Sequence, residues 1–424
     1  MKSTRGIAIS ISEGRVVRDL FYNRLPDMLI KQGYLIDIFT PAARVHSFVD
    51  QWQQPGVNFF ALKPFFMDKK AYRAIEIRKR ILNQFPFLLS SWLKFEKRWL
   101  IKPDFEMVNI LKERQPNLVV ITNPMQHHEQ PIFGAAQALG ILTLGVVRSW
   151  DNLYKGLRIR PDVLAVWNPV NRQEAINLMK YRPDQVEIVG ATQFDPYFDQ
   201  KGVLNREEFA AKLKLDPKRP IITLATLGPF QYQYDETYLM DWLINAILTG
   251  AIPKESQIIC RLHPASRLEQ FLKYQAYDFV RLSWIEGYIP SLAWTMTRED
   301  VYFVGNLLRH SDVVISPGST ITIETAIFDT PTIVPIFHTY QPEMGQLQFN
   351  QHLATHFKRL KDMDLIPIIE KSEDLVPAIQ HALSDRSWYR EQRAKLVQDY
   401  IYFTDGKSTE RLAELIINLS KTHF

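Results

Sequence analysis

A glycine turn and a carboxylate six residues later are the first candidates for chemistry in this sequence. The stretch SDVVISPGSTITIETAIFDTPTIVPIF, Ser311–Phe337, sets Gly318 between an apolar run and a helix-like segment. Backbone N–H groups at such a turn bind anions, and the hydroxyls of Ser319 and Thr320 can add donors or cap the helix. Glu324 is then placed to accept both ribose hydroxyls of a bound nucleotide. A plain capped helix with a solvated glutamate is the structural alternative.

A second candidate pair is Arg261 and His263 in the motif CRLHP. Two residues that are two apart on a strand point to the same side, here near the carboxyl end of the strand. A cation and an imidazole there can bind a diphosphate and neutralise the charge that develops as a bond breaks. A buried histidine beside a surface arginine is the alternative reading.

Candidates for a general base lie in the first half of the chain. Asp151, in VVRSWDNLYKG, is the first choice, because an aspartate can deprotonate an acceptor hydroxyl. Glu13 after the first strand-like run and His127 in the pair His127-His128 are further candidates. A turn that caps the next segment is the alternative for Asp151, and a plain turn is the alternative for Glu13. The adjacent histidines lack the spacing of helical zinc ligands, and we expect no metal site and no cofactor.

Strand-like and helix-like segments alternate along the whole chain, which predicts an α/β fold with parallel sheets. The pattern includes a single amphipathic helix over Val17–Lys31 and stops at a polar stretch near residue 210, after which it starts again. We therefore predict two Rossmann-like domains facing across a cleft, with ligands at the carboxyl ends of the strands.

The domain boundaries follow from the same pattern. Residues 1–200 are expected to form an acceptor-binding domain with a basic-aromatic insertion at 59–102, and residues 201–219 a linker. Residues 220–400 are expected to bind a nucleotide-sugar, and residues 401–424 to form a C-terminal helix that crosses back to the N-terminal domain.

The insertion carries an unusual charge. It holds eleven Lys/Arg against three Asp/Glu, a local +8 in a chain of net charge +5, together with ten aromatic residues. This composition suits an anionic membrane surface, although a helical insertion with inward aromatics is equally compatible. One cysteine, no long apolar run and no signal-like start favour a cytoplasmic location, with peripheral contact on the inner membrane face. No nucleic-acid-binding module is recognised.

Several stretches resemble GT-B-fold glycosyltransferases. Ser311–Phe337 is similar to their donor-nucleotide segment, and the resemblance implies donor-sugar contacts for Gln346 and Gln348. The Arg261-x-His263 element resembles that of teichoic-acid glycerophosphate transferases, in which the histidine serves the donor pyrophosphate. Those polymerases carry Trp-His-Gly where this chain has Trp150-Asp151-Asn152, so the identity of the base differs here.

We therefore predict a metal-independent, inverting glycosyltransferase that moves a sugar from a nucleotide-sugar to a surface-polysaccharide or lipid-linked acceptor. A CDP-polyol phosphotransferase of teichoic-acid type is the alternative, and an inactive GT-B scaffold at the membrane is an alternative of another class. A nucleotide-sugar 2-epimerase would share the fold, but its Gly-Gly-x-Gln-Glu-Glu turn is missing. Phosphate loops, nucleophile elbows and dinucleotide fingerprints are also missing, which removes the common NTPase, serine hydrolase and dehydrogenase classes.

Overall fold

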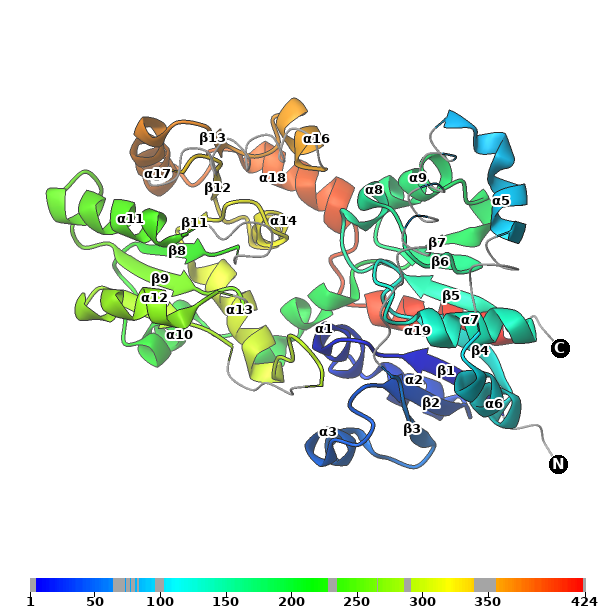
Figure 1. Cartoon of the computed structure of the whole chain (residues 1–424). Helices are drawn as coiled ribbons and strands as arrows, with labels where there is room; N and C mark the ends of the chain where they lie inside the picture. Colours follow the sequence, from blue (N-terminus) through cyan, green and yellow to red (C-terminus); the bar gives the residue numbers. More distant parts are fainter. Residues whose placement is uncertain are drawn as a thin grey trace. The chain divides into compact units, whose positions relative to one another are not determined.

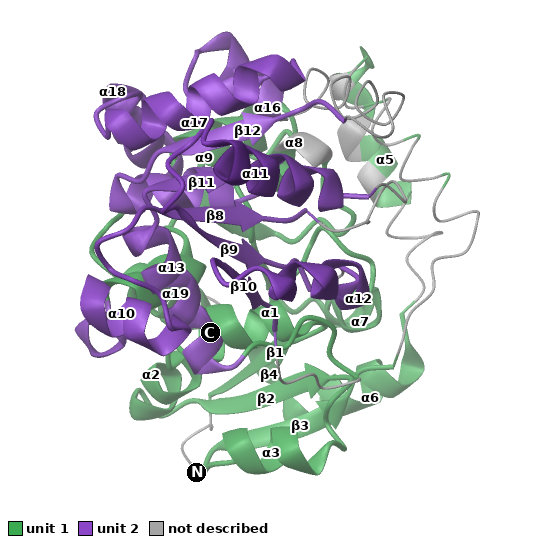
Figure 2. Ribbon diagram, turned by 90° about the vertical axis from the view of Figure 1, so that its left-hand side faces the viewer, with its two compact units in different colours: residues 1–198, 287–296, 402–424 green, residues 199–286, 297–401 purple. Residues whose placement is uncertain are grey.

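The structure of the chain is a computed structural model that describes residues 5–63, 73, 77, 81, 84–95, 103–227, 235–264, 266–285, 291–338 and 356–421. The chain divides into two compact units (Figure 2). Unit 1 comprises Met1–Phe198, Gly287–Met296 and Tyr402–Phe424, and unit 2 comprises Asp199–Glu286 and Thr297–Ile401. Each unit is built around one parallel sheet, which confirms the prediction of two Rossmann-like folds.

Unit 1 contains a seven-stranded sheet with the order β3-β2-β1-β4-β5-β6-β7 (Figure 1). Every pairing is parallel, so the carboxyl ends of neighbouring strands share one edge. The strands are β1 Gly6–Ser10, β2 Leu35–Thr40, β3 Val57–Ala61, β4 Pro116–Ile121, β5 Thr143–Val146, β6 Val163–Val166 and β7 Val186–Ile188.

Alternating side chains of these strands feed two cores. Ile7, Ile9 and Val120 pack on one face with apolar residues of α2, α3 and α19, while Ala8 and Val119 pack on the other with α6 and α7. The helical segments of unit 1 are α1 Gly14–Val16, η1 Val17–Phe21, α2 Leu25–Lys31, α3 His46–Trp52, η2 Pro86–Leu88, α5 Leu89–Phe95, α6 Phe105–Arg114, α7 Gln130–Leu139, α8 Asn152–Lys155, α9 Pro169–Asn177, η4 Pro183–Gln185, η5 Thr192–Phe198 and α19 Ser408–Lys421.

Unit 2 contains a six-stranded parallel sheet with the order β10-β9-β8-β11-β12-β13. The strands are β8 Ile221–Ala225, β9 Gln257–Arg261, β10 Val280–Ser283, β11 Val313–Ile315, β12 Thr332–Pro335 and β13 Ile368–Ile369. Ile258 and Cys260 face the core under α11 and α17, and Ile259 faces the core under α10 and α13. The helical segments are η6 Gln200–Gly202, α10 Arg206–Leu213, α11 Thr237–Thr249, α12 Leu268–Phe271, η7 Leu272–Ala276, α13 Arg298–His310, α14 Ile321–Glu324, η8 Thr325–Phe328, α16 His356–Asp362, η9 Ser372–Asp374, α17 Leu375–Ser384, α18 Arg390–Leu396 and η10 Val397–Ile401.

The single helix predicted over Val17–Lys31 is wrong. A π-helical turn ends at Phe21, and Arg24 has a φ of 63°, in the left-handed region. Pro26 then opens α2, because proline fits the first turn of a helix but not its interior. Pro26 was the available signal in the sequence.

The C-terminal helix α19 belongs to unit 1, where Leu412, Ala413 and Ile416 join the core. Its first turn is held by a distant carboxylate: the backbone N–H groups of Ser408 and Thr409 donate to Asp195 at 3.0 and 2.7 Å. This cap ties the end of the chain to the segment that precedes unit 2.

Within the described part of the chain, no helix has both the length and the apolar composition needed to cross a bilayer.

Candidate functional site

In unit 1, polar side chains gather where β1, β4 and β5 end. These three strands are neighbours in the sheet, so Glu13 after β1, Asn123 after β4 and Arg148 after β5 reach the same region. Arg148 lies at the centre. Its guanidinium donates to Glu13 and, at 2.9 and 3.1 Å, to Asp19 Oδ2. The sequence pattern indicates Glu13 as a site residue but not Arg148 or Asp19.

Glu13 is held from three directions. Besides Arg148, Asn123 Nδ2 donates to its Oε1 at 3.1 Å and Arg15 Nη2 to its Oε2 at 2.9 Å. Burial alone would raise the pKa of Glu13, but Arg148 and Arg15 outweigh it and lower this pKa below the usual glutamate range. Glu13 is therefore a fixed anion at neutral pH and a weak base.

The segment 291–296 completes this part of unit 1, although it follows β10 of unit 2 in sequence. Gly14 N–H donates to Ala293 O at 2.8 Å, and the Arg15 guanidinium lies 4.0 Å from the centre of the Trp294 ring. A Cβ on Gly14 would come within 2.5 Å of the Thr295 backbone, so only glycine fits there. Trp294 itself has a φ of 61°, a left-handed conformation that costs free energy for a bulky residue.

The two other base candidates lie at the same edge. Asp151, at the start of α8, is 7% exposed, and Asn152 Nδ2 donates to its Oδ1 at 3.4 Å. His127 lies after β4, and its ring is tilted by 40° against that of His128 at a centroid distance of 4.7 Å. Burial, helped by His128 and Arg158, lowers the pKa of His127, so its imidazole is neutral near pH 7.

A further carboxyl group was missed by the sequence analysis. Glu129 has no exposed surface and accepts hydrogen bonds from the ends of both β1 and β4. Burial raises the pKa of Glu129 although hydrogen bonds from Ser10, Ser12, Asn123 and Thr122 oppose the shift. Its position eight residues after a buried strand was the only signal in the sequence.

In unit 2, the turn after β11 has the predicted form. Gly318 has a φ of 107°, a conformation that L side chains rarely adopt, and Gly318, Ser319 and Thr320 are partly exposed. The hydroxyls of Ser319 and Thr320 do not cap α14, because Thr320 already has helical backbone angles and Ser319 Oγ lies 3.1 Å from Ser316 Oγ. Glu324 ends α14 and is 7% exposed.

The Arg261-x-His263 element lies at the carboxyl end of β9. Arg261 is buried; its Nη1 donates to Ser283 Oγ at 2.9 Å, and its guanidinium lies 5.7 Å from the Phe303 ring centre. His263 is half-buried, and its backbone N–H donates to Thr226 Oγ1 at 2.8 Å. The two residues therefore differ in their surroundings. Arg261 links β9 to β10, whereas His263 has the more accessible side chain.

Gln346 and Gln348 lie outside the described residues. The described residues also contain no group of three or more His, Cys, Asp or Glu side chains that could hold a metal ion.

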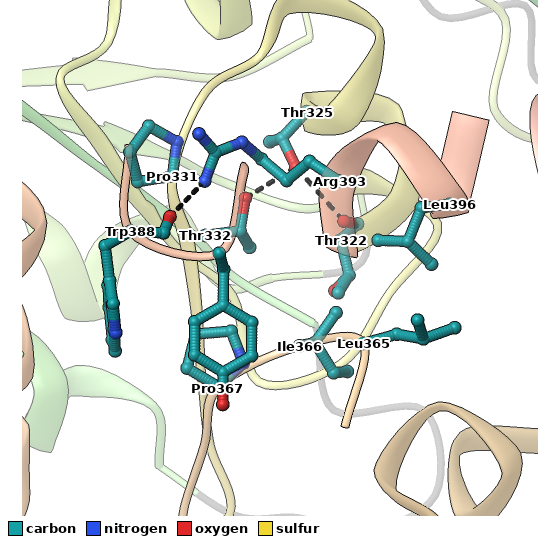
Figure 3. Close-up of a pocket in the computed structure, with 11 residues that line it drawn as sticks. Thr322, Thr325, Pro331, Thr332, Leu365, Ile366, Pro367, Trp388, Arg393 and Leu396 are labelled. Atoms are coloured by element: carbon teal, nitrogen blue, oxygen red, sulfur yellow. Dashed lines mark hydrogen bonds between the residues drawn. The ribbon is translucent and has the colours of Figure 1, made fainter. Parts of the chain in front are cut away.

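A small cavity of about 10 Å³ lies at the amino ends of β12 and β13 (Figure 3). Pro331 and Thr332 at the start of β12 line it, together with Thr322, Thr325 and Arg393. Arg393 donates to the carbonyl of Trp388 across its wall. The volume suits about one water molecule, and the amino ends of the strands are not where Rossmann-like sheets bind ligands. We assign it to the packing of unit 2.

The model of the CDP-Glycerol:Poly(glycerophosphate) glycerophosphotransferase family matches residues 162–418, more than half of the chain. The match contains the donor-side candidates His263, Gly318 and Glu324 but begins after Asp151. A search of curated proteins returned no match.

Solved structures agree on the fold. UDP-GlcNAc 2-epimerase from Methanocaldococcus jannaschii is 13% identical, with 97% of this chain and 99% of that chain covered and a TM-score of 0.57. The UDP-GlcNAc 2-epimerase from Neisseria meningitidis, solved with UDP-GlcNAc, is 12% identical at 97% and 99% coverage, TM-score 0.55. The wall teichoic acid polymerase TagF, in a structure soaked with CDPG, is 12% identical at 99% and 89% coverage, TM-score 0.52. At these identities the likeness shows the GT-B fold alone.

Proposed function

The chain belongs to the CDP-glycerol:poly(glycerophosphate) glycerophosphotransferase family, and from this premise we propose that it transfers a polyol-phosphate group from a CDP-linked donor to a hydroxyl of a cell-envelope glycan or lipid-linked acceptor. The observation that carries the proposal is the family match over 162–418, which includes the strand ends of unit 2. In this reaction the acceptor oxygen bonds to the phosphorus of the polyol phosphate, the bridging P–O bond breaks, and CMP leaves.

The donor is assigned to unit 2. The backbone N–H groups at Gly318, Ser319 and Thr320 bind the phosphates, and Glu324 accepts from the ribose hydroxyls. His263 neutralises the charge that develops on the leaving CMP, with Arg261 as a supporting cation. Gln346 and Gln348 remain proposed donor contacts. Because cationic and backbone donors can do this work, the proposal requires no metal ion.

The acceptor is assigned to unit 1. Asp151 is the proposed base that takes the proton from the acceptor hydroxyl, and His127 is the second choice. Glu13 is the proposed orienting group: a carboxylate held by Arg148, Arg15 and Asn123 keeps one geometry and can accept a hydrogen bond from the acceptor. Its lowered pKa makes it less suited to proton removal.

A nucleotide-sugar donor is the second candidate. It is favoured by Asp151, which stands where teichoic-acid polymerases have the histidine of Trp-His-Gly. In that version the acceptor oxygen attacks the anomeric carbon and a nucleoside diphosphate leaves, with inversion because a base activates the acceptor.

Membrane contact is proposed for the segment 59–102 of a protein located in the cytoplasm. The described part of this segment exposes Phe85, Phe87 and Phe95 at 49%, 76% and 45%. Aromatic side chains beside a local charge of +8 suit an anionic lipid surface. Sedimentation with vesicles of phosphatidylglycerol compared with phosphatidylcholine tests it, and equal binding to both would count against it.

The decisive test of function is a transfer assay. The purified chain is incubated with CDP-glycerol or UDP-GlcNAc and a polyglycerophosphate acceptor, and nucleotide release is measured. The proposal predicts acceptor-dependent release of CMP. Release of UDP alone would move the assignment to the sugar donor, and release of neither would favour a GT-B scaffold without catalysis.

A further inference from the structure

Glu129 is the acid at the strand ends of unit 1 for which the proposed mechanism has no role. It directly precedes α7, where acidic residues commonly cap a helix, yet its side chain forms no capping bond. It has no exposed surface and turns instead to the ends of β1 and β4. A carboxyl group removed from water is tolerated only when its neighbours satisfy it, so those neighbours define its role.

Two contacts of Glu129 reach residues next to Glu13: Ser12, which precedes it in the chain, and Asn123, which donates to it. Ser12, which precedes Glu13, donates from Oγ to Glu129 Oε1 at 2.7 Å. The backbone N–H of Asn123 donates to Glu129 Oε2 at 3.2 Å, and the side chain of Asn123 donates to Glu13 Oε1 at 3.1 Å. Glu129 therefore holds two neighbours of Glu13: Ser12, the preceding residue, and Asn123, whose side-chain amide donates to Glu13.

The remaining contacts define the charge of Glu129. Ser10 Oγ contacts Glu129 Oε2 and also lies 3.1 Å from Val120 O; Thr122 Oγ1 lies 3.1 Å from Glu129 Oε1 and 2.7 Å from Ser10 O. A hydroxyl has one hydrogen, so neither can donate to both partners, and the two carbonyl oxygens can only accept. With an ionised Glu129, two of these four contacts have no hydrogen. A proton on Glu129 Oε2 supplies one of the two missing hydrogens: the carboxyl group then donates to Ser10 Oγ, and the Ser10 hydroxyl donates to Val120 O.

The electrostatic surroundings agree with this count. Among the residues that the structure describes, no cation pairs with Glu129, in contrast to Glu13. The ionisable side chains on the segments around it include Glu13 and Arg15 after β1, His127 and His128 after β4, and Arg148 after β5. Arg15 and Arg148 pair with Glu13, and none of these side chains is a hydrogen-bond partner of Glu129. Burial without a counter-charge favours the neutral form of a carboxyl group.

We propose that Glu129 is a neutral carboxylic acid that acts as a positioning residue, holding Ser12 and Asn123 and, through the Asn123 side chain, the carboxylate of Glu13. The positioning half rests on the proposed orienting role of Glu13. A neutral acid fits this task, because it orders the two loops without adding a third negative charge beside Glu13 and Asp19.

The charge is tested by infrared difference spectroscopy at pH 7, which needs no activity. The spectrum of the wild type minus that of Glu129→Gln is expected to contain the C=O band of a protonated carboxylic acid. The matched control, Glu13→Gln, is expected to lose carboxylate bands only. Loss of carboxylate bands in Glu129→Gln as well would overturn the neutral assignment.

The positioning role is tested by a double-mutant cycle on the transfer reaction. Glutamine at 129 cannot accept from Asn123 N–H on its amide nitrogen, so Glu129→Gln is expected to lower kcat roughly 10- to 100-fold without changing the Kd for CDP. If Glu129 acts through Glu13, the double variant is no slower than Glu13→Gln alone. Additive losses would mean a general structural role and overturn the inference. A wild-type kcat in Glu13→Gln would remove the orienting role from the proposed function, whereas loss in Glu13→Gln with none in Glu129→Gln would overturn this inference alone.

Discussion

The strand ends of unit 1 and unit 2 carry different kinds of side chains. In the described residues of unit 2, a glycine turn, the hydroxyl groups of Thr226 and Ser266 and the half-buried His263 follow β8, β9 and β11. In unit 1 the ends of β1 and β5 carry a buried ion cluster in which Arg148 joins Glu13 and Asp19. A diphosphate brings its own charge and needs donors, whereas a neutral hydroxyl needs fixed partners that orient it. Under the proposed function, the diphosphate is assigned to unit 2 and the acceptor hydroxyl to unit 1.

The first way to break the comparison is to remove the cation of unit 1. Arg148→Met leaves Glu13 and Asp19 buried without their shared partner, and we expect a loss of about 3–5 kcal/mol in the free energy of unfolding. Urea denaturation measures it. The control is Arg182→Met, whose pair with Asp184 is 68% and 66% exposed and is expected to change little. Equal stability of Arg148→Met and the wild type would show that the cluster does not hold unit 1 together.

The second variant separates chemistry from donor binding. Asp151→Asn keeps the shape of the side chain but removes the base, and kcat is expected to fall about 10²–10⁴-fold while the Kd for CDP stays unchanged. Stopped-time transfer assays and calorimetry give the two values. Full activity in Asp151→Asn would transfer the role to His127.

The third variant addresses the donor edge. His263→Ala removes the imidazole proposed to face the leaving phosphate, and kcat/KM is expected to fall roughly 10²-fold. His381→Ala in α17 is the matched control, because His381 stacks on Trp388 away from the strand ends. A loss shared by both variants would point to instability of unit 2 rather than to chemistry.

The smallest expected effect is the acid sensitivity of unit 1. Since Arg148 and Arg15 lower the pKa of Glu13 in the folded chain, its ionised form stabilises the fold above the unfolded pKa. This contribution is lost as the pH falls from that value through the folded pKa. Glu13→Gln is therefore expected to flatten the decline of unfolding free energy between about pH 5 and pH 3. Exposed Glu187, in the same unit, is the control position, and an unchanged decline in Glu13→Gln would argue against a lowered pKa.

Features formed by residues that are close together in the sequence were predicted best. Alternating strands and helices gave both sheets, and the Gly318 turn falls between β11 and α14 as expected. The sequence could not reveal contacts between distant segments: Glu13 and Arg148 are 135 residues apart, and Ser10 and Glu129 are 119 apart. Such pairs arise because parallel strands bring their ends to one edge, so the strand order is needed to find them. The family match covers residues 162–418 and begins after Asp151. It therefore contains the strands of unit 2 but not the strand ends of unit 1 at which Glu13 and Arg148 meet.

The sequence allowed the hydroxyls of Ser319 and Thr320 to cap α14, and the absence of such a cap has a local reason. Thr320 adopts helical angles, and a residue with that backbone cannot direct its hydroxyl to the first free N–H groups. The N–H groups of Thr322 and Ile323 donate instead to the backbone carbonyls of Ser319 and Thr320, at 3.0 Å each.

The central claim is that the strand ends of unit 2 bind a nucleoside diphosphate, and ligand-dependent unfolding tests it most directly. We predict that CDP at one hundred times its Kd raises the free energy of unfolding by about 2.7 kcal/mol, and that Glu324→Gln weakens this stabilisation. The same measurement with UDP, GDP and dTDP shows which nucleobase the site prefers. Stabilisation by none of the four nucleotides would contradict the account.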